Sequence, residues 1–168
     1  MNLSPLQDLD LQQRGRAVAE LLLARGMSMV TAESCTGGWI AKVLTDIPGS
    51  SAWFECGVVA YSYEAKEALL GVHPQTLERT GAVSQETAIE MVSGALARFG
   101  AGVAVAVTGV AGPSGGTPDK PVGTVWIGWK RRGGYAHAEV FHFEGDREAV
   151  RRQTVAAALD GVRRILTS

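Results

Sequence analysis

The sequence has little of what marks secreted, membrane-spanning or nucleic-acid-binding proteins. It holds two cysteines, Cys35 and Cys56, and neither lies in a Cys-x-x-Cys pair or a Cys/His cluster, which argues against a disulfide framework or structural zinc. No apolar run approaches the roughly 18 residues of a membrane span, and residues 1–10 are acidic and polar, unlike a leader. Basic and acidic residues nearly cancel, at 16 against 17. We therefore expect a cytoplasmic protein that binds neither nucleic acid nor a membrane.

Glycine and apolar residues are what the sequence has in quantity. Glycine accounts for 21 of the 168 residues, where about 7% is ordinary, and this excess predicts many tight turns. The chain is 46% hydrophobic, and a chain of this length buries roughly 70% of its unfolded surface in one domain. We expect a single domain over residues 1–168.

Apolar periodicity and breaker residues predict alternating helices and strands. A cap at Ser4, with Pro5 in the first turn, starts a helix that stops at Gly26. Pro74 and Gly81 predict an irregular connection over residues 72–81. The other helices are predicted at 39–45, 62–71, 84–100 and 146–166, and the strands at 27–32, 53–61, 103–107, 122–130 and 135–143.

This order of elements predicts an α/β fold. A hairpin over residues 122–143 puts at least one antiparallel strand in the sheet. The unbroken hydrophobicity of residues 53–61 predicts a strand covered on both faces. We expect a three-layer sandwich with a mixed sheet in the middle.

The segment after the first predicted strand concentrates polar side chains and glycines. It can be a simple turn in which Ser34 or Thr36 caps the next helix. Alternatively, Gly37 and Gly38 leave backbone N–H groups open to an anion at the start of the helix, and Glu33 is an unusual residue for a strand end without a partner. Ligand crevices of open α/β sheets lie at such strand ends, so this segment is a candidate site.

Lys66 is a candidate general base. It lies in the first turn of the helix after Ser62, where the helix dipole disfavours an ammonium and burial would lower its pKa further. A lysine near neutrality can remove a proton from a nucleophile. The alternative is a solvated lysine paired with Glu67. Tyr61 and Ser51 lie within one strand length of Lys66, and this company favours catalysis.

Two other segments are candidate anion sites. Arg147, Arg151 and Arg152 oppose the dipole at the start of the last helix, so they either bind a carboxylate or phosphate or pair with nearby acids. Residues 108–116 carry four glycines after a strand but match neither a Walker loop nor a dinucleotide fingerprint. That loop can still present N–H groups to a phosphate or an oxyanion. The three histidines are too scattered for a metal site.

Six ordered motifs between residues 31 and 125 form a specific pattern. They are Thr-Ala-Glu-Ser-Cys-Thr-Gly-Gly at 31–38, Gly-Ser-Ser-Ala-Trp-Phe at 49–54, Tyr-Ser-x-Glu-Ala-Lys at 61–66, Gly-Ala-Val-Ser at 81–84, Thr-Gly-x-Ala-Gly-Pro at 108–113 and Lys-Pro-Val-Gly-Thr-Val at 120–125. This pattern resembles the CinA C-terminal domain family. The resemblance implies a three-layer α/β/α sandwich on a five-stranded mixed sheet, mostly parallel with one antiparallel strand, and a homodimer.

The resemblance also implies an activity and a set of catalytic residues. The expected reaction is hydrolysis of nicotinamide mononucleotide to nicotinate mononucleotide and ammonia, in pyridine nucleotide salvage, with no metal or redox cofactor. Longer members carry a preceding nucleotide pyrophosphatase domain, and this chain resembles the stand-alone deamidase form. By the family pattern, Ser51 is the expected nucleophile, and Tyr61 and Lys66 complete a Ser-Tyr-Lys arrangement in which neutral lysine, acting directly or through the phenol, is the base.

The remaining candidate residues are expected to hold the ribose phosphate and the oxyanion. They are Ser34, Thr36, Gly37, Gly38, Thr108, Gly109, Arg147 and Arg151. Cys35 is a rival nucleophile, because a helix N-terminus lowers the pKa of a thiol. A different functional class is a nucleotide-sensing or competence- and DNA-damage-associated regulatory module that does not hydrolyse its ligand. Ammonia release from nicotinamide mononucleotide distinguishes the two classes.

Overall fold

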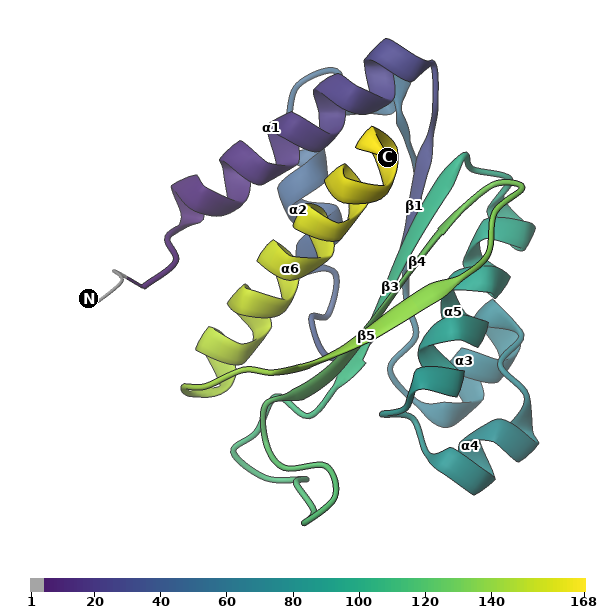
Figure 1. Ribbon diagram of the computed structural model, residues 1–168, viewed down its shortest axis with the longest axis vertical. Helices are drawn as coiled ribbons and strands as arrows, with labels where there is room; N and C mark the ends of the chain where they lie inside the picture. The colour runs from purple at the N-terminus through teal and green to yellow at the C-terminus, as the bar shows by residue number, and fades with distance from the viewer. Residues whose placement is uncertain (1–4) are drawn as a thin grey trace.

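The computed structural model describes residues 5–168, and it places a five-stranded sheet between two groups of helices (Figure 1). Helices α1, α2 and α6 cover one face of the sheet, and α3, α4 and α5 lie on the other. This arrangement confirms the expected three-layer sandwich. The elements are α1 (Asp8–Arg25), β1 (Met29–Glu33), α2 (Trp39–Thr45), a 3-10 helix (Ser50–Ala52), β2 (Phe54–Val59), α3 (Tyr63–Leu70), α4 (Pro74–Thr80), α5 (Gln85–Phe99), β3 (Val103–Gly109), β4 (Thr124–Arg131), β5 (His137–His142) and α6 (Arg147–Thr167).

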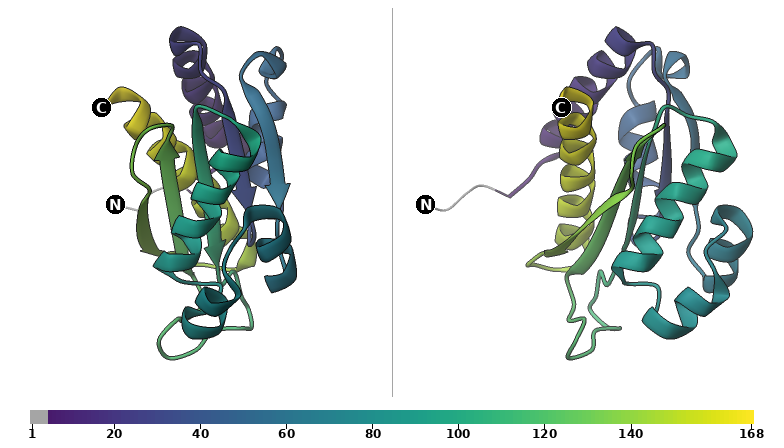
Figure 2. Two further views of the ribbon diagram at one scale, coloured as in Figure 1. Left: turned by 90° about the vertical axis from the view of Figure 1, so that its right-hand side faces the viewer. Right: turned by 45° about the vertical axis from the view of Figure 1, so that its right-hand side comes forward.

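The sheet has the strand order β2-β1-β3-β4-β5. Strand β1 is parallel to both β2 and β3, whereas β4 is antiparallel to β3 and β5. Four strands therefore run one way and β4 runs the other, which confirms the mixed sheet with one antiparallel strand. Figure 2 shows helices lying along both faces of this sheet. Because the carboxyl ends of β1, β2 and β3 share one edge of the sheet, the segments that follow these strands meet there.

The core is divided by the sheet into two layers whose side chains differ in size. On β3, Val103, Val105 and Val107 face α1 and α6, whereas Ala104 and Ala106 face α5. The small alanines allow α5 to pack closely on the sheet. On the other face, the Trp129 indole packs against Gly161 of α6, where an added Cβ would lie 2.1 Å from the indole ring. A buried tryptophan needs a partner for its N–H, and here Nε1 donates to the Ala158 carbonyl at 3.0 Å.

Local cap signals predicted the helix boundaries well. The side chains of Ser62, Ser84 and Asp146 each accept a backbone N–H and start α3, α5 and α6. Glycines at 26, 71 and 100 adopt the left-handed conformation and end α1, α3 and α5. Among residues 5–168, no helix combines the length and the apolarity needed to cross a membrane.

Three expectations about the elements were wrong or fall outside the structure. Helix α1 begins at Asp8 with Gln7 as N-cap, so Pro5 is not in it; the expected cap Ser4 lies outside the described residues. Residues 72–81 contain helix α4, because Pro74 occupies the first helical position, where its missing N–H costs nothing. Strand β2 is an edge strand with exposed positions, and it is not covered on both faces.

Candidate functional site

A buried lysine lies at the carboxyl ends of β1 and β2. Ser62 caps α3, and the cap fixes Lys66 in the first turn of that helix, with 1% of its surface exposed. Its Nζ lies 3.0 Å from Ser34 Oγ, 3.0 Å from the Ala60 carbonyl and 2.9 Å from the Tyr61 carbonyl. Burial lowers the pKa of this amine below its ordinary value. The expectation of a desolvated lysine at this position is confirmed.

The three neighbours of the Lys66 amine can satisfy either charge state, because the ammonium donates one N–H to each of them and the neutral amine donates two and accepts one. A neutral amine has two N–H groups and one lone pair, and the carbonyls of Ala60 and Tyr61 can only accept hydrogen bonds. If they take both N–H groups, the lone pair faces the hydroxyl of Ser34, which can donate. Among residues 5–168, no carboxylate oxygen lies within 4.0 Å of Nζ to hold the charged form. The geometry suits a base that receives a proton from Ser34.

Ser34 belongs to a tight loop that follows β1. Its backbone N–H donates to the Val107 carbonyl at 3.1 Å, which continues the pairing of β1 with β3 by one residue. The loop then turns, with Gly37 N–H donating to the Ser34 carbonyl at 3.1 Å. Gly37 and Gly38 have φ values of 61° and 97°, which residues with a side chain rarely adopt. These two glycines therefore shape the loop.

Two ionisable side chains hold this loop in place. The Glu33 carboxylate is fully buried and accepts hydrogen bonds from the Thr36 hydroxyl at 2.6 Å and from two backbone N–H groups of α2. Burial raises the pKa of Glu33 above its ordinary value. From α6, Arg151 donates to the carbonyls of Cys35 and Thr36, both at 3.0 Å. Thr36 and Arg151, which we expected to bind substrate, are used here to hold the loop.

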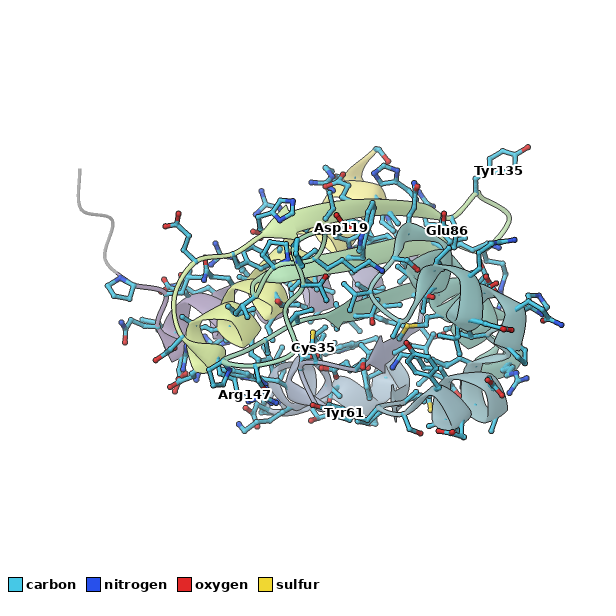
Figure 3. The ribbon with its side chains drawn as sticks, turned by 90° about the horizontal axis from the view of Figure 1, so that it is seen from below. Cys35, Tyr61, Glu86, Asp119, Tyr135 and Arg147 are labelled. Atoms are coloured by element: carbon cyan, nitrogen blue, oxygen red, sulfur yellow. The ribbon has the colours of Figure 1, made fainter. Side chains whose placement is uncertain are left out.

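Tyr61 and Arg147 lie together at the exposed rim of this end of the sheet. The Tyr61 side chain is 61% exposed, and its hydroxyl lies 3.4 Å from Arg147 Nη2. Arg147 Nη1 donates to the Gly112 carbonyl at 2.7 Å, so the guanidinium also holds the loop after β3. Figure 3 shows Tyr61 and Arg147 on the same side of the molecule. Tyr61 thus gives its carbonyl to Lys66 and its phenol to the surface.

Thr108 and Gly109 end β3 and fix a neighbouring loop. The Thr108 hydroxyl donates to the Ala82 carbonyl at 2.8 Å, which ties residues 81–84 to the sheet. Gly109 packs so closely on β4 that an added Cβ would lie 2.6 Å from a Val125 methyl carbon. Both residues therefore position backbone around the site.

Ser51 lies at the other end of the sheet. It belongs to the exposed 3-10 helix that precedes β2, whereas Lys66 belongs to the helix that follows β2. The six residues of β2 separate the two positions by about 20 Å at 3.3 Å per residue. The structure therefore does not bring Ser51 to Lys66 within one chain, contrary to the expected grouping. Closeness in sequence was misleading because Ser51 and Lys66 flank the same strand.

The sequence did contain the signal that pairs Lys66 with Ser34. Each of these residues follows one of two parallel strands, and the carboxyl ends of parallel strands share one edge. Cys35, the rival nucleophile, is buried in the apolar core, and burial raises the pKa of its thiol to about 12. Cys35 is therefore a neutral thiol at physiological pH, contrary to the expectation that the helix start lowers its pKa.

A cavity of about 480 Å³ opens on the outer side of the loop, between α1, α2 and α6. Its walls include Gly37, Gly38 and Trp39, but neither Ser34 nor Lys66. The Arg152 guanidinium lies 4.9 Å from the centre of the Trp39 ring and is paired with acidic side chains of α1 and α6. The cavity is therefore separate from the serine and the amine. Within the described residues, no group of three His, Cys, Asp or Glu side chains could hold a metal ion.

Comparison with known proteins places this arrangement in context. The sequence pattern of the family described as CinA C-terminal domain matches residues 11–166. The chain is 51% identical to the nicotinamide-nucleotide amidohydrolase PncC of Escherichia coli K12 over 92% of its own length and 93% of the relative. It is 59% identical to PncC of Pseudomonas putida, over 80% and 83%. The crystal structure of the competence/damage inducible protein CihA from Agrobacterium tumefaciens superposes with a TM-score of 0.92 at 42% identity, covering both chains fully.

Proposed function

The chain belongs to the CinA C-terminal domain family, and from this premise we propose that it hydrolyses the carboxamide of nicotinamide mononucleotide to the carboxylate and ammonia. Relatives 51% and 59% identical over most of the chain are named for nicotinamide-nucleotide amidohydrolase activity. The observation that carries the proposal is the buried Lys66 amine 3.0 Å from Ser34 Oγ. A hydroxyl beside a desolvated amine can carry out acyl transfer to a serine, because the amine can act as the base that this reaction needs.

In this proposal Ser34 is the nucleophile and Lys66 is the base. The Lys66 lone pair takes the Ser34 proton while Oγ attacks the amide carbon, which the adjacent pyridinium makes electrophilic. Backbone N–H groups of the loop stabilise the oxyanion. The tetrahedral intermediate collapses, the Lys66 ammonium gives its proton to the amide nitrogen as the C–N bond breaks, and that nitrogen leaves as ammonia. A water molecule, deprotonated by Lys66, then cleaves the acyl-serine ester and regenerates Ser34.

The rim residues bind the rest of the nucleotide. Arg147 presents a guanidinium beside the Tyr61 phenol at the exposed edge, which suits the substrate phosphate. Glu33, Thr36 and Arg151 hold the loop, and Thr108 holds its neighbour. This proposal differs from the arrangement expected from the sequence in two ways. The nucleophile is Ser34 in place of Ser51, and the Tyr61 phenol binds substrate in place of relaying a proton. We also propose that the protein is a cytoplasmic homodimer that acts in pyridine nucleotide salvage.

The test is ammonia release from purified protein incubated with nicotinamide mononucleotide, with and without EDTA. We expect stoichiometric ammonia and nicotinate mononucleotide, at rates that EDTA does not change. Nicotinamide riboside and free nicotinamide serve as parallel substrates that lack the phosphate. If no pyridine amide releases ammonia and the nucleotide still binds with a measurable Kd, the protein is a nucleotide-sensing module and not a hydrolase. Sedimentation analysis of the same sample measures the assembly state.

A further inference from the structure

Helix α2 begins without a side chain of its own to cap it. Its N-cap is Gly38, which offers no oxygen for the first N–H groups of the helix. The φ value of 97° at Gly38 is one that a capping serine or aspartate rarely adopts, so glycine is favoured at this position. The start of this helix therefore depends on an acceptor from elsewhere in the chain.

Glu33 supplies that acceptor from the end of β1. One carboxylate oxygen accepts the N–H of Ile40 at 2.9 Å, and the other accepts the N–H of Ala41 at 3.0 Å. The same group accepts the Thr36 hydroxyl at 2.6 Å. A single carboxylate thus ties the end of a strand, the middle of the loop and the first turn of a helix. Ser34 lies inside the segment that these bonds enclose.

The Glu33 carboxylate lies away from the Lys66 amine. Glu33 bonds to α2, on one face of the sheet, whereas Lys66 reaches Ser34 from α3, on the other. Its oxygens are already occupied by one hydroxyl and two backbone N–H groups. Burying a carboxyl group costs free energy unless it is hydrogen-bonded, and an apolar residue at this position could not accept these three bonds.

We propose that Glu33 is a positioning residue, whose carboxylate holds the loop so that Ser34 Oγ stays within reach of the Lys66 amine. This inference rests on the proposed function. Glu33 touches neither substrate nor the proton in transit. It acts through Thr36 and the start of α2, and Arg151 supports the loop from outside by binding two of its carbonyls. Loss of the carboxylate is expected to reduce how often Ser34 occupies the reactive position.

The test compares Glu33→Gln with Thr31→Val. Thr31 is buried two residues earlier on the same strand, and its hydroxyl lacks a hydrogen-bond partner among the described residues, so valine removes no bond there. Glutamine keeps the shape of Glu33 but turns one acceptor into an N–H donor that faces a helix N–H. We expect kcat to fall on the order of 100-fold in Glu33→Gln, with KM and the pH dependence of kcat unchanged. Thr31→Val should keep wild-type kcat.

Amide hydrogen exchange provides a readout that does not need substrate. In Glu33→Gln, the amides of Ile40 and Ala41 should exchange faster, whereas the amides of α5 keep their protection. Uniformly faster exchange, including α5, would indicate general destabilisation and overturn the inference. So would wild-type kcat, or a shifted pH profile, which would assign Glu33 a direct role in proton transfer.

Glu33→Asp keeps the charge but shortens the side chain by one methylene, and it serves if Glu33→Gln fails to fold. It should give the same pattern of lower kcat and local exchange; wild-type kcat in this variant would equally overturn the inference. If the wild-type protein releases no ammonia, the proposed function fails and positioning for catalysis fails with it. In that case the exchange result shows whether Glu33 caps α2 for stability alone. Failure of the inference by itself appears as an active wild type and an equally active Glu33→Gln.

Discussion

The two ends of the sheet each present a serine where a strand meets a turn. The two serines differ in their burial and in the side chains around them. At the carboxyl end, Ser34 is buried, lies in a loop held by two ionisable side chains, and faces the Lys66 amine. At the amino end, Ser51 is exposed on a short 3-10 helix. A serine hydroxyl becomes a nucleophile only beside a group that can remove its proton. The surroundings distinguish these two serines, whereas their local sequence does not.

The same contrast extends to stability. The carboxyl end holds two buried ionisable groups, Lys66 and Glu33, and burial shifts the pKa of each toward its neutral form. Such groups reduce the stability of a fold unless hydrogen bonds offset the loss of water. The proposed chemistry is therefore located where the fold buries ionisable groups and depends on hydrogen bonds to offset their lost hydration.

The largest effects are expected from removing either member of the proposed pair, and Lys66→Met removes the amine that distinguishes the two ends. We expect kcat/KM for ammonia release to fall by about 10⁴-fold, at the upper end of what general base catalysis contributes. Full activity of this variant would break the comparison, because the carboxyl end would then not depend on the amine. Lys66→Arg is the matched control, since it keeps a cation but cannot act as a base near neutral pH.

Lys66→Met also allows a pH test of whether the Lys66 amine is buried. The folded pKa of Lys66 is below its unfolded value of 10.5, so the protein loses stability as pH falls through the folded pKa. The free energy of unfolding of the wild type relative to Lys66→Met should therefore rise with pH up to about 10.5. Urea unfolding at neutral and alkaline pH measures it. A flat difference would mean that the amine is solvated.

The second prediction compares the same substitution, serine to alanine, at the two ends of the sheet. Ser34→Ala should lower kcat by on the order of 10⁴-fold or more, because it removes the nucleophile. Ser51→Ala should change kcat by less than about threefold, as is usual for an exposed residue outside a site. Steady-state ammonia release from both variants decides the assignment. An active Ser34→Ala with an inactive Ser51→Ala would reverse the roles of the two ends.

The third prediction separates binding from chemistry within the carboxyl end. Arg147→Ala should raise KM for nicotinamide mononucleotide about 10- to 100-fold, the loss of a charged hydrogen bond to phosphate, with little change in kcat. KM for the riboside, which lacks the phosphate, should not change. An equal rise for both substrates would show that Arg147 holds the loop through Gly112 and does not bind phosphate.

The smallest effect is expected from Cys35→Ala. The thiol next to Ser34 has its pKa raised to about 12 by burial, so it is not a thiolate near neutral pH. Ammonia release should stay within about threefold of wild type, as for a side chain that takes no part in the reaction. Cys35→Ser is a useful companion, because it keeps the size of the side chain and adds a stronger hydrogen-bond donor. An inactive Cys35→Ala in a folded protein would make the thiol the nucleophile.

Helix boundaries were predictable because caps are local. Ser62, Ser84 and Asp146 each need only a neighbouring N–H three residues ahead. The exposure of β2 was not predictable from its apolar sequence, because edge position depends on the order of strands across the sheet. Helix α4 is not predicted when Pro74 is read as a residue that interrupts helices, because Pro74 occupies the first position of this helix.

The site was predictable in part. A desolvated Lys66 followed from its place in the first turn of α3, and the structure confirms it. The grouping of Lys66 with Ser51 rested on proximity in sequence and on the family pattern, whereas the structure places Ser51 at the other end of β2 within one chain. The roles of Glu33 and Arg151 depend on tertiary contacts with α2 and with the loop, and no sequence pattern specifies such contacts.

Tyr61 serves two neighbours with two different parts of one residue. Its main chain carbonyl supports the Lys66 amine, and its ring faces the solvent beside Arg147. Any amino acid at position 61 supplies the carbonyl, so the ring can be replaced without removing this contact of the Lys66 amine. Laboratory evolution toward amides of other shapes could begin at this position, because the side chain proposed to contact the substrate varies there while Ser34 and Lys66 stay unchanged.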